Sequence, residues 1–274
     1  MGPGLYFGIG KQAKDLLNKD YLTDKKFTLT TITEDGVRFT STGTNKNSQS
    51  LGEIQTQFES NGFITEMKVN SDAKLCTSIT TENLGPGFKS IFSFVVPDQK
   101  SGKLELQYLH DYAGISTNFG LTASPVVNFA GVFGTKSLAV GTDIGFDTAT
   151  GKFVKYNAGV SYKDVDYTVS LTVDDKANSA TCSYYHHVSP LTNTAVGGEL
   201  KHCFSSNENI LTFGAQHALD PFTTIKARIN NSGKVNALIQ HQPNSKFQVT
   251  FSGEVDTKAI DKSSKVGLAI AIKP

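Results

Sequence analysis

Hydrophobic and polar residues alternate along most of the chain, in runs of about ten residues that begin near Lys25. In the run near 165–173, for example, Val169 and Leu171 alternate with Ser170. Successive side chains of a β-strand point to opposite faces, so this period of two predicts strands with one apolar and one polar face. We therefore expect an all-β fold after the N-terminal segment.

Turn-forming residues separate these runs, for example at Ser60-Asn61-Gly62 and at Asn231-Ser232-Gly233. Asn and Gly readily adopt the backbone conformations that tight hairpins require. Counting from turn to turn gives nineteen expected strands and no helix among them. They lie near residues 26–33, 36–44, 51–60, 63–70, 74–82, 88–96, 102–110, 115–123, 126–134, 137–147, 152–162, 165–173, 178–187, 192–202, 208–217, 221–230, 234–242, 246–255 and 264–272.

The alternation fits two classes of β-protein. A soluble sandwich or propeller alternates as well, and a soluble β-rich binding protein is the alternative reading. However, nineteen strands linked by hairpins are too many for one open twisted sheet. The polar faces carry Ser, Thr, Asn, Gly and mixed charges, which cannot fill an inner layer. Tilted strands of about ten residues cross the hydrocarbon layer, so the pattern favours a transmembrane β-barrel.

The segment from Leu5 to Tyr21 follows a different period, that of an amphipathic helix. It is too short to cross a membrane, and Gly8 and Gly10 predict a break near its start. We divide the chain into a helix with its linker, 1–24, and a barrel, 25–274. The apolar side of the helix carries Ile9, Ala13, Leu16 and Leu17, and the other side carries Lys11, Lys14, Asp15, Asn18 and Lys19.

The composition agrees with a sheet that has one apolar face and one face in contact with water. Only 38% of the 274 residues are hydrophobic, whereas globular domains have about 45 to 50%. The formal net charge is +1, from 26 basic and 25 acidic side chains, so we expect no specific nucleic-acid binding. No stretch resembles a transmembrane helix or the apolar core of a signal peptide.

No constellation for catalysis, a metal or a cofactor is expected. The three cysteines, Cys76, Cys182 and Cys203, have no metal-ligand spacing. His186 and His187 are adjacent on an expected strand, so they point to opposite faces and cannot share a metal. The sequence near 145–152 resembles a phosphate-binding loop but lacks its spacing and its strand-to-helix context. An enzyme is therefore not expected.

Residues 217–239, HALDPFTTIKARINNSGKVNALI, resemble the signature segment of the eukaryotic porins, the voltage-dependent anion channels of the mitochondrial outer membrane. The N-terminal GPGLYFGIGKQAKDLLNKDY, LQYLHDYAGI at 106–115 and VDTKAIDKSSKVGLAIAIKP at 255–274 resemble the plant members in particular. The resemblance covers the whole chain. The matching signature residues are His217, Asp220, Pro221, Thr223, Ala227, Arg228, Ile229, Asn230, Asn231, Asn236, Ala237 and Ile239.

This resemblance implies a barrel of nineteen strands, the number known for the family. An odd number of strands in a meander requires the first and last strands, near 26–33 and 264–272, to run parallel where the barrel closes. The resemblance also implies that the N-terminal helix lies in the pore and takes part in voltage gating, with a surface-lying anchor as the alternative. Some animal members carry a lipid-facing Glu on the fourth strand, where our alignment places Ser60, beside Glu59.

A lysine at mid-depth on the lipid side of a barrel costs about 2 to 4 kcal/mol. The polar faces should therefore line a water-filled pore, as barrels with sixteen to eighteen strands already enclose one. Ile225, Ala227 and Ile229 should face lipid. The residues expected to line the pore and bias its selectivity are Lys11, Lys14, Lys19, Arg38, Lys68, Lys89, Lys103, Lys201, Lys226 and Arg228, with Glu105 among the acidic wall residues.

A wide pore of this kind biases ions by wall charge rather than by dehydration. We therefore expect weak anion preference, with nucleotides (ATP, ADP), phosphate and small anions as permeants. Membrane lipid is an expected partner, and a homo-oligomer and a platform for docking cytosolic proteins stay open. The mitochondrial outer membrane is the expected location, with the plastid outer envelope as an open second one. The end of the chain also resembles the sorting signal of mitochondrial barrels, at Lys265, Gly267, Ile270 and Ile272.

Overall fold

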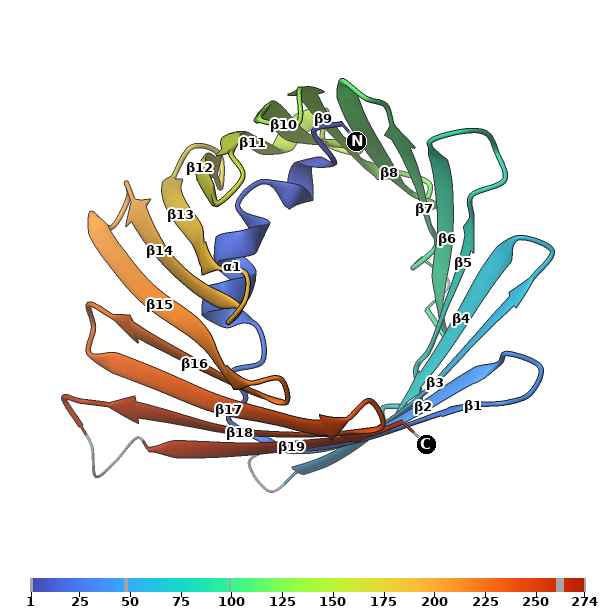
Figure 1. Cartoon of the computed structure of the whole chain (residues 1–274). Coiled ribbons are helices and arrows are strands. Elements are labelled where there is room, and N and C mark those ends of the chain that lie inside the picture. Colours follow the sequence, from blue (N-terminus) through green and yellow to red (C-terminus); the bar gives the residue numbers. More distant parts are fainter. Residues whose placement is uncertain (1, 47–48, 99, 260–263, 274) are drawn as a thin grey trace.

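The computed structural model describes residues 2–46, 49–98, 100–259 and 264–273. Within these residues, nineteen strands form one sheet that closes into a barrel, and a short helical segment lies inside it (Figure 1). Each strand pairs with the strands before and after it in the sequence. The all-β barrel of nineteen strands with an internal helix is thus confirmed.

The sheet contains the following strands. They are β1 (Lys25–Ile32), β2 (Arg38–Lys46), β3 (Gln49–Ser60), β4 (Phe63–Asn70), β5 (Leu75–Thr81), β6 (Phe88–Val96), β7 (Lys103–Leu109), β8 (Ala113–Gly120), β9 (Val126–Gly134), β10 (Leu138–Asp147), β11 (Lys152–Lys163), β12 (Tyr167–Asp174), β13 (Ser179–Ser189), β14 (Thr194–Cys203), β15 (Glu208–Asp220), β16 (Thr223–Asn230), β17 (Lys234–Asn244), β18 (Phe247–Asp256) and β19 (Lys265–Ile272).

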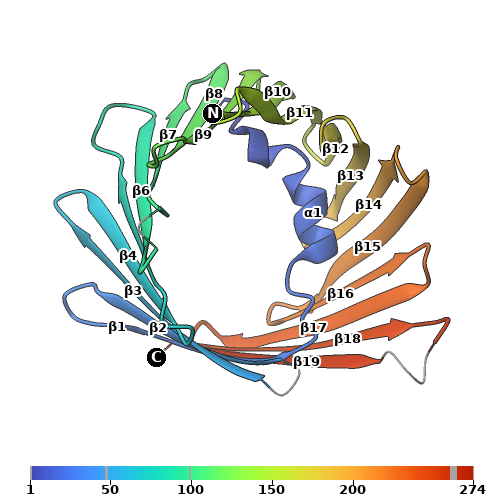
Figure 2. The same cartoon turned by 180° about the vertical axis from the view of Figure 1, so that it is seen from behind.

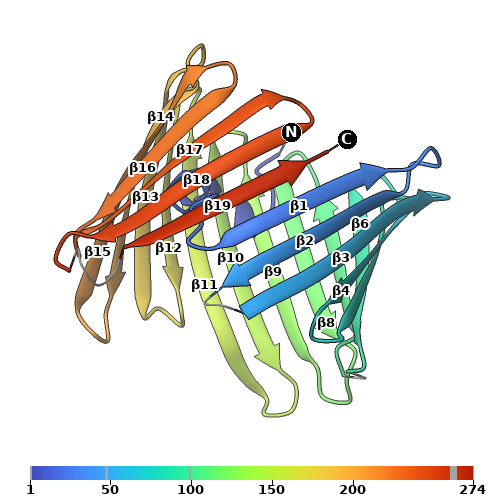
Figure 3. The same ribbon diagram turned by 90° about the horizontal axis from the view of Figure 1, so that it is seen from below.

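The barrel closes through a parallel pair. β1 and β19 run in the same direction, with Lys25 opposite Leu268 and Leu29 opposite Ile272 (Figure 3). All other neighbouring strands are antiparallel, as hairpins require; β1, for example, pairs with β2 in this way. The parallel closure expected from an odd strand number is therefore confirmed.

The β3–β4 hairpin corrects one detail of the alignment. Asn61 and Gly62 have φ angles of 52° and 76°, as both central residues of a type I′ turn require. Ser60, opposite Phe63, therefore ends the third strand and does not lie on the fourth. The outward positions of β4 are Phe63, Thr65, Met67 and Val69, and none carries a carboxylate.

One strand begins and ends earlier than the sequence indicated. The strand expected at 115–123 is β8, which spans Ala113–Gly120. The amide of His110 donates a hydrogen bond to the carbonyl of Ala113 at 2.7 Å, which closes a tight turn. This turn contains neither Gly nor Pro, so no composition signal marked it.

The N-terminal segment folds as a 3₁₀ turn, η1 (Tyr6–Gly8), and an α-helix, α1 (Lys11–Asn18), both inside the barrel (Figure 2). The helix is shorter than the expected Leu5–Tyr21. Gly10 separates the two parts with a left-handed backbone, φ 71°, which is compatible with glycine and unfavourable for most residues. In the described residues, no helix has the length and apolar character needed to cross a membrane.

Most large apolar side chains lie on the outer surface, and the small buried core lies elsewhere. Phe213 and Phe251 are 55% and 56% exposed, whereas Leu17 and Val132 are 1% and 0% exposed. The buried residues lie on the N-terminal segment and on the inner wall. The fold thus places an apolar surface outward and packs one part of its inner wall against the helix.

Candidate pore lumen

The pairing between strands shows which side chains point into the barrel. Residues opposite each other in a ladder project to the same face of the sheet. Arg228 is on the inner face, because its guanidinium contacts the internal helical segment. Following the pairing around the barrel places on the same face the expected residues Arg38, Lys68, Lys89, Lys103, Glu105, Lys201 and Lys226.

The three lysines of the N-terminal segment are also exposed inside the barrel. Lys11 and Lys14 lie on α1, and Lys19 follows its last residue. Lys11 also lies over the Phe7 ring, with its Nζ 5.8 Å from the ring centroid. All ten expected cations therefore project into the lumen or lie on its wall. Their effect on ion selectivity stays a prediction.

Acidic residues neutralise part of this charge. Lys68 Nζ lies 2.9 Å from Glu53 Oε1, and Lys155 pairs with Asp143 on the inner wall. Because these pairs lie beside water, each contributes little to stability. Their main effect is on the field inside the pore, which combines both signs.

The helix packs on an inner wall that is made of small residues. Leu16 and Leu17 are 4% and 1% exposed, and α1 contacts β13, β14 and β15. A Cβ atom at Gly197 would lie 2.8 Å from Leu16 Cδ2, and one at Gly214 would lie 2.6 Å from Leu17 Cδ2. At either distance the leucine side chain would have to shift to make room for a Cβ. Glycine at these two positions therefore allows the helix to approach the wall.

Arg228 holds the end of the helix. Its Nη1 donates to the carbonyl of Leu17 at 2.6 Å and to Asn18 Oδ1 at 2.7 Å. Its Nε donates to Asn236 Oδ1 at 3.2 Å, and its guanidinium carbon lies 4.7 Å from the centroid of the Tyr21 ring. A guanidinium suits this site because it donates in several directions within one plane and stacks on aromatic rings. We refer to these contacts of Arg228 as the helix latch.

Lys226 has a similar position. Its Nζ lies 3.4 Å from Asp20 Oδ2, and its side chain is only 10% exposed. Lys226 and Arg228 were expected to face the water inside the barrel. Both do point inward, but the N-terminal segment covers Lys226 and engages Arg228. The sequence pattern identified their face and could not reveal their partners.

Tyr21 is half-buried beside the latch. Burial raises the pKa of its phenol to about 12, and the neighbouring positive charge of Arg228 opposes this rise. The phenol is therefore neutral at physiological pH, and its ring is available as a surface for the guanidinium.

The expected sorting residues all lie on β19. Lys265 and Gly267 project inward, and Ile270 and Ile272 project outward. Gly267 also has a structural reason to be glycine, because the carbonyl of Leu22 lies directly against it. Sorting itself stays a prediction. In the part of the chain that the structure describes, no three His, Cys, Asp or Glu residues come together as a metal site.

Comparison with known proteins identifies the family. The sequence model of the eukaryotic porins matches residues 2–267. The chain belongs to the eukaryotic porin family. This porin is 59% identical over 274 residues to the mitochondrial outer membrane protein porin 1 of Oryza sativa subsp. japonica, with all of both chains covered. It is 53% identical over 273 residues to the outer plastidial membrane protein porin of Pisum sativum, which covers 100% of this chain and 99% of the relative.

A solved bacterial porin shares the fold of this porin. A triple mutant of the Rhodopseudomonas blastica porin superposes with a TM-score of 0.50 at 8% identity, covering 80% of this chain and 88% of the other. At this identity the likeness concerns the barrel architecture alone.

Sequence reasoning missed several residues of the lumen of this porin. Asp20 and Tyr21 were placed at the end of the expected helix without a partner, and Gly197 and Gly214 had no role. One signal was available, because Leu238 and Val132 are apolar residues at inward positions, where the pattern is mostly polar. Both are nearly fully buried. An inward apolar residue is not a sufficient signal by itself, because Ile210 is also inward and is 47% exposed.

Proposed function

We propose that this porin forms a voltage-gated, weakly anion-selective channel in the mitochondrial outer membrane, which passes ATP, ADP and phosphate. The name of the rice relative supports this location, and the name of the pea relative makes the plastid envelope a second location to test. The closed barrel supports a channel, because barrels with sixteen to eighteen strands already enclose water. A channel of this kind transports solutes and catalyses no reaction.

One observation carries the proposal on selectivity: cations of the inner wall remain exposed opposite and beside the helix. Arg38, Lys103 and Lys201 are exposed on the inner face. Lysine is a strongly hydrated point charge that attracts phosphate groups without clamping them. The acidic partners of Lys68 and Lys155 reduce the field. A modest excess of anion over cation permeability follows.

The docking of the helix supports the proposal on gating. The segment is attached to the wall by a small apolar contact through Leu16 and Leu17 and by the helix latch. Much of its remaining surface is polar and faces water. Few contacts must change for the segment to move, and its lysines would carry charge through the electric field as it moved.

Reconstitution into a planar bilayer tests both parts. We expect a large conductance that falls at either voltage polarity, and a reversal potential in a salt gradient that favours anions. Deletion of residues 2–20 should abolish the fall at high voltage and preserve conductance. Absence of conductance would contradict the channel, whereas unchanged voltage dependence after the deletion would contradict only the role of the helix.

Charge reversal tests the wall. The variant Lys201→Glu changes an exposed cation and should lower the ratio of anion to cation permeability. Lys226→Glu combined with Arg228→Glu should lower it too, but this variant also removes the latch and should alter voltage dependence. An unchanged reversal potential in both variants would exclude these residues as determinants of selectivity.

A further inference from the structure

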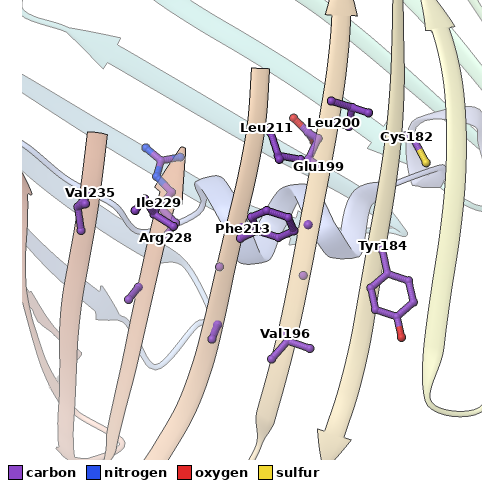
Figure 4. Close-up of a pocket in the computed structure, with 15 residues that line it drawn as sticks. Cys182, Tyr184, Val196, Glu199, Leu200, Leu211, Phe213, Arg228, Ile229 and Val235 are labelled. Carbon is purple, nitrogen blue, oxygen red and sulfur yellow. The ribbon is translucent and has the colours of Figure 1, made fainter. Parts of the chain in front are cut away.

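The outer surface carries a groove that conduction does not require. It crosses strands β13 to β17 and has a volume of about 830 Å³ (Figure 4). The hollow forms because Gly198, Ala215 and Ala227 are small residues at outward positions of three neighbouring strands. Larger apolar side chains, among them Phe213, line the rest of it. The groove is therefore apolar and opens toward the lipid side of the barrel.

One end of the groove is polar. The hydroxyl of Tyr184, at the groove, lies 2.9 Å from Nδ1 of His186, and the hydroxyl of Thr194 lies 2.8 Å from Nδ1 of His217. His186 is opposite Val196 of the groove, and His217 follows Ala215 at the next outward position. Two imidazoles thus stand at the same edge, each oriented by a hydroxyl.

These histidines lack a partner for their second ring nitrogen within the described part of the chain. At the described outward positions of β14, β15 and β16, the only charged residue is Asp220, at the end of β15 and opposite Thr223. When the hydroxyl donates to Nδ1, the ring proton resides on Nε2, which then points outward as a donor. A polar group on a lipid-facing wall is unfavourable unless it finds a hydrogen-bond partner. The bilayer must supply that acceptor.

The same edge lies at the level of the membrane interface. The rings of Tyr162, Tyr167, Tyr184 and His186 follow one another at centroid distances of 6.1, 6.4 and 6.2 Å. Girdles of aromatic residues mark the interfaces of membrane barrels, where one part of the ring is in hydrocarbon and the other in water. Phospholipid headgroups occupy this level.

The depth of the groove matches one leaflet. Leu211, at the far end of the groove, and His217, one outward position beyond its last lining residue Ala215, are six residues apart on β15. At about 3.4 Å per residue the separation is about 20 Å along the strand, and a tilt of about 45° makes it roughly 14 Å across the membrane. Half of the hydrocarbon layer is about 15 Å. An acyl chain that begins at the histidines would reach the middle of the bilayer.

We propose that this groove binds one membrane phospholipid, with an acyl chain lying over Gly198, Ala215 and Ala227 and its phosphodiester accepting hydrogen bonds from His186 and His217. His241 stands at the same rim on β17, with its Nδ1 2.9 Å from the hydroxyl of Thr223. The nearby carboxylate of Asp220 interacts electrostatically with it. That negative charge would repel a phosphate, so His241 is excluded from the site. The site depends on the outer wall facing lipid and not on conductance.

Native mass spectrometry of the refolded chain with palmitoyl-oleoyl phosphatidylcholine tests the site. The unmodified chain should retain one lipid. Ala215→Leu fills the groove and should lower this retention by about tenfold. The matched control is Ala158→Leu, another exposed outward alanine, on β11 and away from the groove; it should retain the lipid. Equal retention by both variants would overturn the proposal.

The headgroup contact is tested separately. His186→Leu combined with His217→Leu should lower retention by about fivefold or more, since two hydrogen bonds are lost. His202→Leu is the control, because His202 is an outward histidine at the other end of β14, paired with Asn209. On the unmodified chain, which requires no variant to fold, diacylglycerol with the same acyl chains should be retained less than phosphatidylcholine. Equal retention of the two lipids would refute the phosphodiester contact.

Two readouts separate this proposal from others. The conductance of each variant in planar bilayers should equal that of the unmodified chain, which shows that the barrel has folded and keeps the test independent of the channel function. If Ala215→Leu changes the oligomeric state and leaves lipid retention unchanged, the groove is an interface between copies of this chain and the proposal is wrong.

Discussion

Two parts of the inner wall differ although the same alternation encodes both. On β14 and β15, behind the helix, inward positions carry small residues such as Gly197 and Gly214. On β2 to β7, across the lumen, inward positions carry long charged side chains such as Arg38, Lys68 and Glu105. The first wall is covered by the protein itself, and the second faces water.

This difference shows that a period of two only assigns a residue to a face. What the face contacts is determined by the size and charge of its residues. Small residues bring a backbone close enough for Leu16 and Leu17 to be buried, whereas charged residues require water or an ion partner. The wall behind the helix should therefore be sensitive to added volume. The wall that faces water, on β2 to β7, should be sensitive to changes in charge.

The largest expected effect is that of added volume on the covered wall. Gly214→Val places methyl groups where Leu17 lies, since even a Cβ would be 2.6 Å from its Cδ2. Overpacking costs about 1 to 3 kcal/mol. This cost should change the equilibrium constant between the docked and the undocked helix by about 5- to 150-fold, in favour of the undocked helix. Trypsin should then cleave after Lys14 and Lys19 faster in reconstituted vesicles. Gly52→Val is the control, because a Cβ at Gly52 has no atom within 4 Å; equal cleavage of both variants would contradict the packing argument.

A smaller effect is expected from the latch. Arg228→Ala removes the bonds to the carbonyl of Leu17 and to Asn18, and bonds to a charged donor contribute about 1.5 to 3 kcal/mol. Partial exposure to water should reduce this value, and Lys at this position should not restore it. The voltage at which half of the channels close should shift in single-channel records.

Lys201→Ala sharpens the comparison with Arg228→Ala. It removes one positive charge from an exposed part of the inner wall, so it should change the reversal potential and leave the closing voltage unaltered. If both variants changed only the reversal potential, the latch would have no part in holding the helix.

The smallest effect concerns pH. The pKa of Tyr21 is raised to about 12 from an ordinary 10.0, so docking favours the neutral phenol. The contribution is fully present below pH 10 and is lost as pH rises through about 12. The ionisation of Tyr21 should therefore not affect docking between pH 6 and 9. The difference between the alkaline absorbance titrations of the unmodified chain and Tyr21→Phe should have a midpoint near pH 12, and a midpoint near 10 would show that Tyr21 is not buried.

Much of the fold could be predicted because each residue of a barrel strand faces either lipid or water. A charged residue such as Lys103 is far more stable toward water than toward lipid, so the energetics assign its face without any tertiary information. The family resemblance supplied the same number of strands as the turn count, so the two agree but are not independent. The position at which the helix docks on the wall could not be predicted. It depends on contacts between residues about 200 positions apart, such as Leu17 and Arg228.

The parallel seam between β1 and β19 has a consequence for how such barrels can change over time. Duplication or loss of a hairpin adds or removes two strands, so it never changes whether the strand number is odd or even. A lineage that once acquired an odd number keeps a parallel seam through any series of such events, however much the pore widens or narrows. The seam of Lys25 and Leu268 therefore persists through every such event, and only the gain or loss of an odd number of strands could remove it.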